Sequence, residues 1–187
     1  MRAIWVLLAM VAGALLAGPA AAAGKFYVYS TSIPKDHKLT NAQVFNGFGC
    51  KGDNTSPALA WKGAPADTKS FAVTVYDPDA PTGSGWWHWI VYNIPPAVTS
   101  LDEGAGSGKG LPAGAGQGRN DYGASAFGGA CPPPGKPHRY IITVFALKTD
   151  KIDVDANASA ALIGFMLNAN KIGTARMIAR YGQPPKS

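Results

Sequence analysis

The feature that most constrains the fold is a set of three long runs of β-branched and aromatic residues with no helical pattern between them. These runs cover residues 70–76, 86–94 and 138–147, and segments rich in Gly and Pro separate them. Apolar alternation over such lengths is typical of β-strands. Strands that follow one another without crossover helices pair antiparallel. We therefore predict a mostly β protein with two antiparallel sheets packed face to face as a β-sandwich.

The glycine and proline content supports a loop-rich chain. The 187 residues include 23 Gly and 15 Pro, and 15% of residues are charged against 47% that are hydrophobic. The apolar runs exclude a disordered chain, and the lack of sustained heptads excludes a coiled coil. We expect a single domain over residues 24–187, with shorter strands at 26–30 and 59–61 and a Gly-rich surface loop over 104–118.

The C-terminal part of the chain has a helical rather than a strand pattern. Apolar residues recur there at positions i, i+3, i+4 and i+7 in two successive sets. This spacing predicts one or two short C-terminal helices that cover the sheet, with the apolar residues in the core. The two sets are Leu162, Phe165, Met166 and Ala169, and then Thr174, Met177, Ile178 and Tyr181.

The first 23 residues have the pattern of a secretory signal peptide. Arg2 provides a positive start, an apolar run covers residues 4–16, and Ala21 to Ala23 form an Ala-x-Ala cleavage pattern. An uncleaved membrane anchor is the alternative, but the run is shorter than the roughly 20 residues that span a bilayer. We expect cleavage after Ala23 and an exported protein, periplasmic or secreted, that is not an integral membrane protein.

The net charge of +6 raises the question of an anionic partner. The basic residues are scattered along the chain, and no Arg-rich helix or stripe of basic and aromatic residues is present. Nucleic-acid-binding domains usually cluster their positive charge. We therefore expect no nucleic-acid partner, and the charge mainly favours solubility.

Cys50 and Cys131 are the two cysteines of the chain. In an oxidising compartment an even number favours a disulfide over a metal site or a catalytic thiol. Two free buried thiols are the alternative. If the bridge forms, the loop over residues 47–54 lies beside the loop over residues 128–135.

Polar side chains suited to ligand binding lie at strand ends and in the adjoining turns. Asp77 and Asp79 follow the first long run, His88 lies in the second, and His138 and Tyr140 share one face of the third. A histidine in an apolar strand is more often a hydrogen-bonded core residue, and Asp before Pro is a common turn starter. The convergence of carboxylates, imidazoles and a phenol in three short segments nevertheless favours a binding site.

Strand parity and the missing motifs narrow the chemistry of such a site. Parity places His88 with Trp86 and Ile90, and turns Arg139 away from His138. No Gly-x-Ser-x-Gly, Walker or dinucleotide motif occurs, nor does His-x-His or His-x-x-x-His spacing. We therefore expect no cofactor, no metal and no catalytic residue. Imidazoles, a phenol and backbone N–H groups between Pro and Trp walls indicate a pocket for a phosphate or a carboxylate.

Four ordered motifs resemble the signatures of the phosphatidylethanolamine-binding protein family, also called the Raf kinase inhibitor protein family. They are DPDAP at 77–81, WHWIVYN at 87–93, GGACPP at 128–133 and HRY at 138–140. The resemblance is closest to the short bacterial YbhB/YbcL-like branch and extends over about residues 26–182. The C-terminal part of this chain is short, whereas eukaryotic members place a further helix or segment near their pocket. Kinase regulation is not carried over from them to a protein that we expect to be exported.

The resemblance implies two antiparallel sheets with C-terminal helices, and a small pocket that accepts phosphate or phosphorylated head groups. The segments around Cys50 and Cys131 are similar to those of exported bacterial members, which implies a disulfide beside the pocket. The opposite parity of Arg139 suggests a structural ion pair with an acidic residue. The candidate ligand-binding residues, with Trp86 as an apolar wall, are Asp77, Asp79, Pro81, Trp86, His88, Pro132, Pro133, His138 and Tyr140.

We expect a binding module for a small anionic ligand rather than an enzyme. His88, His138 and Tyr140 would donate hydrogen bonds to the anion, and affinity should rise as the pH falls through the pKa of a histidine. Asp77 and Asp79 would fix the imidazole tautomers and the loop. One alternative is an inhibitor or modulator of another protein, such as a kinase or a peptidase, that uses the pocket and the Gly-rich loop. Another is a hydrolase that uses a metal or acid–base chemistry.

Overall fold

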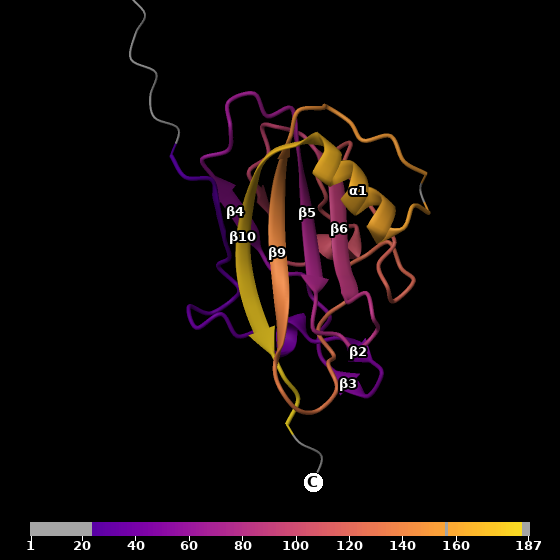
Figure 1. Ribbon diagram of the computed structural model, residues 1–187. Helices are drawn as coiled ribbons and strands as arrows, with labels where there is room; N and C mark the ends of the chain where they lie inside the picture. Colours follow the sequence, from indigo (N-terminus) through magenta and orange to yellow (C-terminus); the bar gives the residue numbers. More distant parts are fainter. Residues whose placement is uncertain (1–23, 156, 185–187) are drawn as a thin grey trace, which may run out of the picture.

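A large antiparallel sheet is the main element of this computed structural model, which describes residues 24–155 and 157–184 (Figure 1). The expected signal peptide, residues 1–23, lies outside the described residues. The three long strands that the sequence predicts all lie in this sheet, so the mostly β fold class is confirmed. In spatial order the sheet contains β10 (Lys171–Tyr181), β9 (His138–Leu147), β5 (Ser70–Asp77), β6 (Trp86–Ile94) and β8 (Gly116–Gln117).

Two smaller sheets complete the β structure. The three-stranded sheet has the order β1 (Tyr27–Tyr29), β4 (Leu59–Lys62) and β7 (Ser100–Leu101), and the two-stranded ribbon joins β2 (Asn46–Gly47) to β3 (Cys50–Lys51). One short 3₁₀ helix, η1 (Asn41–Gln43), precedes the ribbon. The Gly-rich loop is partly ordered, because it contains a second 3₁₀ helix, η2 (Ala105–Ser107), and strand β8.

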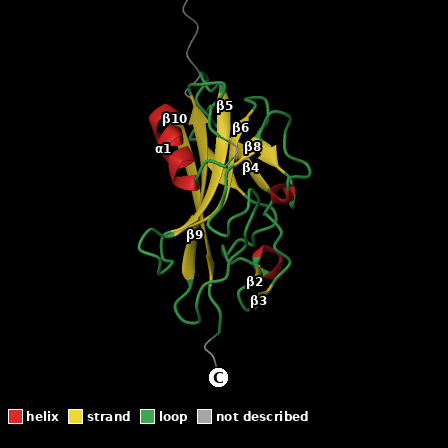
Figure 2. Cartoon of the chain, turned by 90° about the vertical axis from the view of Figure 1, so that its right-hand side faces the viewer, coloured by secondary structure: helices red, strands yellow, loops and turns green. Residues whose placement is uncertain are grey.

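Two apolar layers lie on opposite faces of the large sheet. On one face, Val73 and Val144 pack against Trp61 from the small sheet. On the other face, Ile90 packs with residues of helix α1 (Ala160–Asn170), which covers this side in Figure 2. Because successive side chains of a strand point to opposite faces, the long strands read as nearly continuous apolar runs.

Helix α1 confirms the first predicted helix, but not the face that it buries. Ser159 caps the helix, since its Oγ accepts the N–H of Leu162 at 3.2 Å. Ile163 and Leu167 are fully buried, whereas Leu162 and Phe165, which were expected in the core, are 49% and 69% exposed. The helix is apolar on both sides, so spacing alone does not select the buried face.

The second predicted helix is wrong, because residues 171–181 form strand β10. Over residues 175–180 exposure alternates with a period of two. Ala175, Met177 and Ala179 are buried or partly buried, and the residues after each of them, Arg176, Ile178 and Arg180, are exposed. The helical spacing of the apolar residues is therefore coincidental. The free edge of β9 offers an antiparallel partner from Leu147 to His138, and pairing with it outweighs the local pattern.

Candidate functional site

The antiparallel order of the central strands brings three polar strand ends together. Asp77 ends β5, while Trp86 and His138 begin β6 and β9. A cavity of about 160 Å³ opens there. The candidate residues that line it are Asp77, Pro81, Trp86, His88, Pro132, Pro133, His138 and Tyr140. Both imidazoles thus share one crevice, and Asp79 is the one candidate that does not line it.

A β-bulge directs His88 toward this cavity. Val75 of β5 pairs with Trp89, and the next residue, Tyr76, pairs with Trp87, so His88 is an extra residue in β6. The predicted parity is therefore wrong for Ile90, which packs on the helix side of the sheet. A bulge commonly re-aims a side chain beside a functional site. The ring of His88 instead meets that of Tyr140, with centroids 5.0 Å apart.

The hydrogen bond of His88 defines its tautomer. Its Nδ1 lies 2.7 Å from the carbonyl oxygen of Gly128, which can only accept, so Nδ1 carries the proton. Burial lowers the pKa of His88 because it disfavours the imidazolium, although the Gly128 carbonyl and Asp77 oppose this. The neutral ring has a lone pair on Nε2, and this buried atom has no partner in the described structure.

Two further buried polar atoms at the cavity have no hydrogen-bond partner in the described structure. These are the hydroxyl of Tyr140 and the indole Nε1 of Trp86. Burial, followed by the charge of Asp77, raises the pKa of Tyr140 far above its ordinary value, so the phenol keeps its proton. Leaving a buried polar group unpaired costs about 1–3 kcal/mol. The cavity therefore offers two donors and one acceptor to a ligand.

Asp77 and His138 form a nearly buried pair beside these atoms. Asp77 Oδ2 lies 2.7 Å from His138 Nδ1, and the two side chains are 4% and 13% exposed. Asp77 Oδ1 also accepts the backbone N–H of Asp79 at 2.8 Å, which closes the turn after β5. The carboxylate thus orients the ring of His138 and leaves its Nε2 for the cavity.

Asp79 has a different role from the one expected. Within the described residues it forms no hydrogen bond or ion pair with an imidazole. It accepts the backbone N–H of Arg139 and two guanidinium N–H groups, at 2.9, 2.9 and 2.7 Å. The ion pair expected for Arg139 is therefore confirmed. Hydrogen bonds from Arg139 lower the pKa of Asp79 to about 2. This pair ties the turn after β5 to the start of β9, and so fixes the cavity rim.

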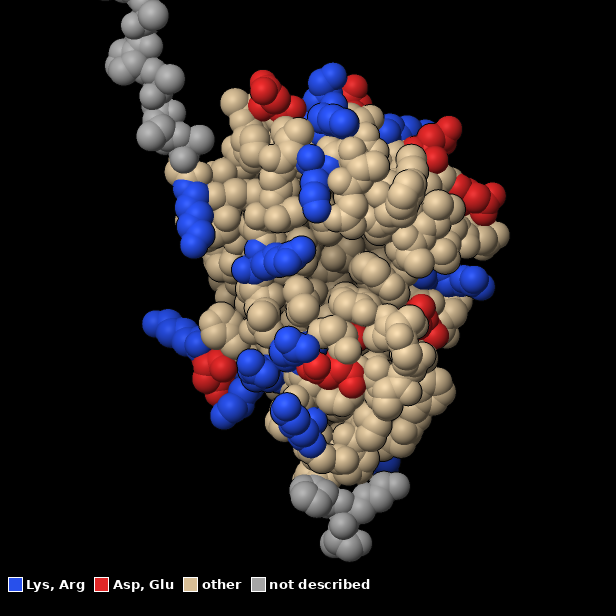
Figure 3. Space-filling view, viewed as in Figure 1, with Lys and Arg blue, Asp and Glu red and all other residues tan. Residues whose placement is uncertain are grey.

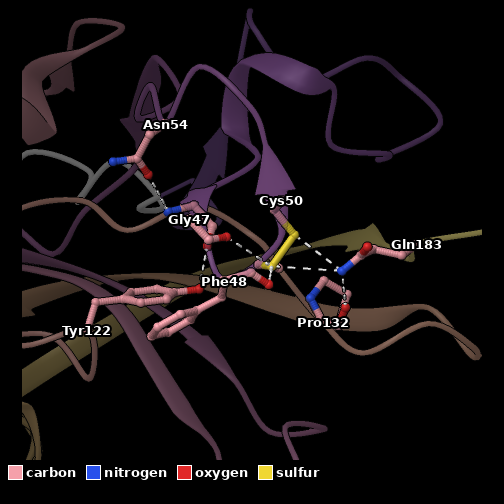
Figure 4. Close-up of a disulfide and its surroundings, with 9 residues drawn as sticks. Gly47, Phe48, Cys50, Asn54, Tyr122, Pro132 and Gln183 are labelled. Atoms are coloured by element: carbon pink, nitrogen blue, oxygen red, sulfur yellow. Dashed lines mark hydrogen bonds between the residues drawn. A yellow bond between two sulfur atoms is a disulfide. The ribbon is translucent and has the colours of Figure 1, made fainter.

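The disulfide predicted between Cys50 and Cys131 is present, with the sulfurs 2.08 Å apart. It joins the β2–β3 ribbon to the segment that carries the rim residues Pro132 and Pro133. Gln183 reinforces the junction, because its Nε2 donates to the Pro132 carbonyl at 2.6 Å (Figure 4). A covalent link thus holds two walls of the cavity together.

Two aromatic residues of the cavity were missed by the sequence interpretation. Phe48 and Tyr122 line it, with ring centroids 5.6 Å apart, and Figure 4 shows them side by side near the disulfide. Phe48 lies two residues before Cys50, so the predicted bridge itself was a signal for it. Tyr122 lies in an irregular segment without periodicity, and no comparable signal marks it.

Glycine is required where the rim segment passes behind the cavity. A Cβ atom at Gly129 would lie 2.5 Å from the carbonyl oxygen of Gln43 and 2.6 Å from the amide of Phe45. The close approach allows the amide of Gly129 to donate to Asn54 Oδ1 at 2.7 Å, and its carbonyl to accept from the Tyr122 hydroxyl at 2.9 Å. The preceding carbonyl, that of Gly128, is thereby aligned with His88.

The described residues, 24–155 and 157–184, hold no group of three or more His, Cys, Asp or Glu side chains arranged to bind a metal ion. No helix within this part of the chain is long and apolar enough to cross a membrane. At the cavity, the acidic and imidazole groups are engaged with each other and with the backbone, as Asp77 is with His138.

Comparison with known proteins identifies the family. The model of the family described as phosphatidylethanolamine-binding protein matches residues 30–182. The chain belongs to the phosphatidylethanolamine-binding protein family. It is 62% identical over 164 residues to the UPF0098 protein YbcL of Escherichia coli K12, covering 86% of this chain and 90% of that protein. Over 153 residues it is 50% identical to YbhB of the same organism, covering 81% and 97%.

Solved structures of this family agree with the fold. The crystal structure of E. coli YbcL, described as a new member of the mammalian family, matches with a TM-score of 0.82 and 61% identity over 84% of this chain and 98% of that one. A homologue from Chlamydia trachomatis matches with a TM-score of 0.69 and 27% identity over 84% and 97%. The predicted resemblance to the bacterial YbhB/YbcL-like branch of the phosphatidylethanolamine-binding protein family is confirmed.

Proposed function

We propose that the cavity binds a phosphate group, either free or as part of a phosphorylated head group, and that the protein is an exported binding module. The observation that carries the proposal is the set of three buried polar atoms without partners: Trp86 Nε1, His88 Nε2 and Tyr140 Oη. Unpaired buried groups at one cavity are expected where a ligand completes their hydrogen bonds. A tetrahedral oxyanion presents several oxygens to such convergent groups.

The tautomer of His88 defines which hydrogen-bonding group the ligand must present to its Nε2. With Nδ1–H donating to Gly128, the neutral ring accepts at Nε2, so it does not donate as the sequence suggested. A phosphate that retains one proton can donate its P–OH to Nε2 and accept from Tyr140 and Trp86. Phosphate esters exchange this proton near pH 6, so the monoanion is available under mildly acidic conditions.

The surroundings of the cavity favour small-molecule binding over a docking role for the Gly-rich loop. No residue of 104–118 lines the cavity. The pair of Asp77 with His138 supplies an imidazole edge without adding a free carboxylate, which suits an anionic guest. Apolar walls from Pro132 and the aromatic residues favour a ligand with an organic portion next to the phosphate.

Isothermal titration calorimetry with inorganic phosphate and phosphoethanolamine tests this proposal. His88→Ala should abolish binding. Tyr140→Phe should weaken it at least roughly tenfold, because a hydrogen bond to a charged group contributes about 1.5–3 kcal/mol. Tyr140→Phe should leave stability unchanged, since its hydroxyl has no protein partner. Tyr92→Phe, on the helix side of β6, is the matched control and should bind like the parent protein. Equal affinities for the Tyr140 and Tyr92 variants would refute the site.

A further inference from the structure

A second, basic groove adjoins the cavity on the outer side of its rim. It encloses about 660 Å³ and shares Pro81, Pro133 and His138 with the cavity. Lys136 and Arg180 contribute positive charge to its lining. Figure 3 shows Lys and Arg side chains gathered over the ends of β9 and β10 at this pole of the molecule. A ligand held in the cavity would therefore lie next to a positively charged groove.

The charges of this groove do not balance. Three cations line it, Lys136, Arg139 and Arg180, against the single carboxylate of Asp79, which is engaged by Arg139. Within the described residues, no acidic side chain lies within 4.0 Å of the Lys136 or Arg180 charge. Two of the positive charges in the groove are thus left for another partner.

The strand register adds an independent indication. Arg180 of β10 is the direct cross-strand partner of Arg139 in β9. Directly opposed residues project from the same face of a sheet, and like charges at such positions are destabilising. Asp79 pairs with Arg139 but not with Arg180. An external anion beside Arg180 would therefore relieve the remaining repulsion between the two arginines.

We propose that this groove binds a second anionic group of the same ligand, whose phosphate lies in the cavity. This inference rests on the proposed function. It defines the ligand as a phosphate compound with a second phosphate or carboxylate beyond the rim at Pro81 and Pro133. The cavity selects the phosphate through hydrogen bonds to its buried polar atoms. The exposed groove selects charge, and its contribution weakens with added salt because exposed charges are screened within about 8–10 Å at physiological ionic strength.

Calorimetric titration with paired phosphonates tests the inference. Propylphosphonate presents one anionic group, and propylene bisphosphonate presents two on the same spacer; the ethylene to pentylene members vary the span. At least one bisphosphonate should bind about fivefold to tenfold more tightly than propylphosphonate, as expected for two exposed charge contacts. The double variant Lys136→Gln/Arg180→Gln should lose this preference and keep its affinity for propylphosphonate.

The matched control removes two positive charges at the other end of the large sheet. Lys69 precedes β5 and Lys148 follows β9, both exposed and far along the strands from the cavity. Lys69→Gln/Lys148→Gln should retain the full preference. A preference that is equal in the two double variants would reflect net charge and overturn the inference. Binding of propylphosphonate without any preference in the series also overturns it, while leaving the proposed function intact; binding of neither compound class would overturn both.

Discussion

Strand β6 contains two irregularities of pairing, and the two extra residues are used differently. Near its far end, Phe71 pairs with Ile94 and Val73 with Val91, so Asn93 lies in a bulge. Both polar atoms of the Asn93 side-chain amide bond to the backbone of Ile152. The oxygen accepts the Ile152 N–H at 2.7 Å, and the nitrogen donates to the Ile152 carbonyl at 3.1 Å.

At the cavity end, the side chain of the bulge residue His88 is only partly hydrogen-bonded. His88 bonds to Gly128 through one nitrogen, and its other nitrogen has no partner. A bulge thus places a fully engaged side chain at one end of β6 and a partly unpartnered one, at the proposed binding site, at the other. The difference teaches that hydrogen-bond satisfaction, rather than backbone irregularity, distinguishes a site from a structural joint.

The largest effect is expected at the disulfide, which tests how far the cavity end depends on covalent support. Cys50→Ala/Cys131→Ala releases a loop of 81 residues. On the loop-entropy model this should lower the free energy of unfolding by roughly 4 kcal/mol. Urea denaturation of the variant and of the oxidised parent protein measures the difference. A midpoint unchanged within error would mean that the non-covalent contacts of the ribbon hold this end alone.

The next effect separates stability from binding at the far bulge. Asn93→Ala removes two partly buried hydrogen bonds and places alanine at a φ of 58°, so it should destabilise the protein by about 2–3 kcal/mol. Phosphate affinity should remain at the parent value, measured by calorimetry below the unfolding temperature. A loss of affinity in this variant would show that the two bulges are coupled and that the contrast between them is too simple.

A third prediction concerns the proton at His88. Sulfate matches phosphate in shape but carries no proton near neutral pH, so it cannot donate to a neutral Nε2. We expect sulfate to bind roughly 30-fold more weakly than phosphate at about pH 6, the equivalent of about 2 kcal/mol. The affinity for phosphoethanolamine should fall as the pH rises above the second pKa of its phosphate, because the ester dianion has no proton left and binding then requires proton uptake.

The control for this prediction follows from the lowered pKa of His88. An imidazolium would donate to both anions and would remove the discrimination, so sulfate should approach phosphate only at acidic pH, below the lowered pKa. Equal affinities for the two anions at pH 7, measured by competition, would show that Nε2 is protonated in the complex.

The smallest effect is expected at the Asp79–Arg139 pair on the rim. Asp79→Asn should lower the free energy of unfolding by less than about 1 kcal/mol, because the Arg139 and Asp79 side chains are 44% and 30% exposed and solvent screens the charges. The folded-state pKa of Asp79 is depressed to about 2. Its contribution is therefore present above the unfolded value of about 4 and is lost as the pH falls toward 2. Unfolding curves of parent and variant should converge over that window.

The sequence predicts the long central strands correctly, but it predicts the C-terminal secondary structure less well. The β9 run is found with the expected bounds, because its β-branched and aromatic residues are buried on both faces. The helix predicted over residues 171–181 is wrong, because the strand with which they pair is β9, which is distant in sequence and does not show in a local pattern. The prediction of which face of α1 is buried is wrong, because Phe165 and Ile163 are both apolar. Packing of the helix against the sheet decides which of them is buried.

Residue types located the site, but not its hydrogen bonding. Short ordered motifs place Asp77 and His138 at adjacent strand ends, and these residues do line the cavity. The bulge at His88 depends on the register of two strands, and the role of Asp79 depends on where the Arg139 guanidinium reaches. Both are properties of three-dimensional pairing that a single sequence does not encode locally.

The extra residue in β6, His88, contributes to the cavity but is not needed for the pairing of β6 with β5. A descendant chain lacking only His88 would restore an uninterrupted ladder between Val75–Trp89 and Tyr76–Trp87. Such a deletion would remove the unpartnered Nε2 of the proposed site, and with it the carbonyl that accepts the N–H of Gly128 at 2.9 Å. Among relatives of this length, we expect an alignment gap at that single position to mark members that lack the proposed phosphate site.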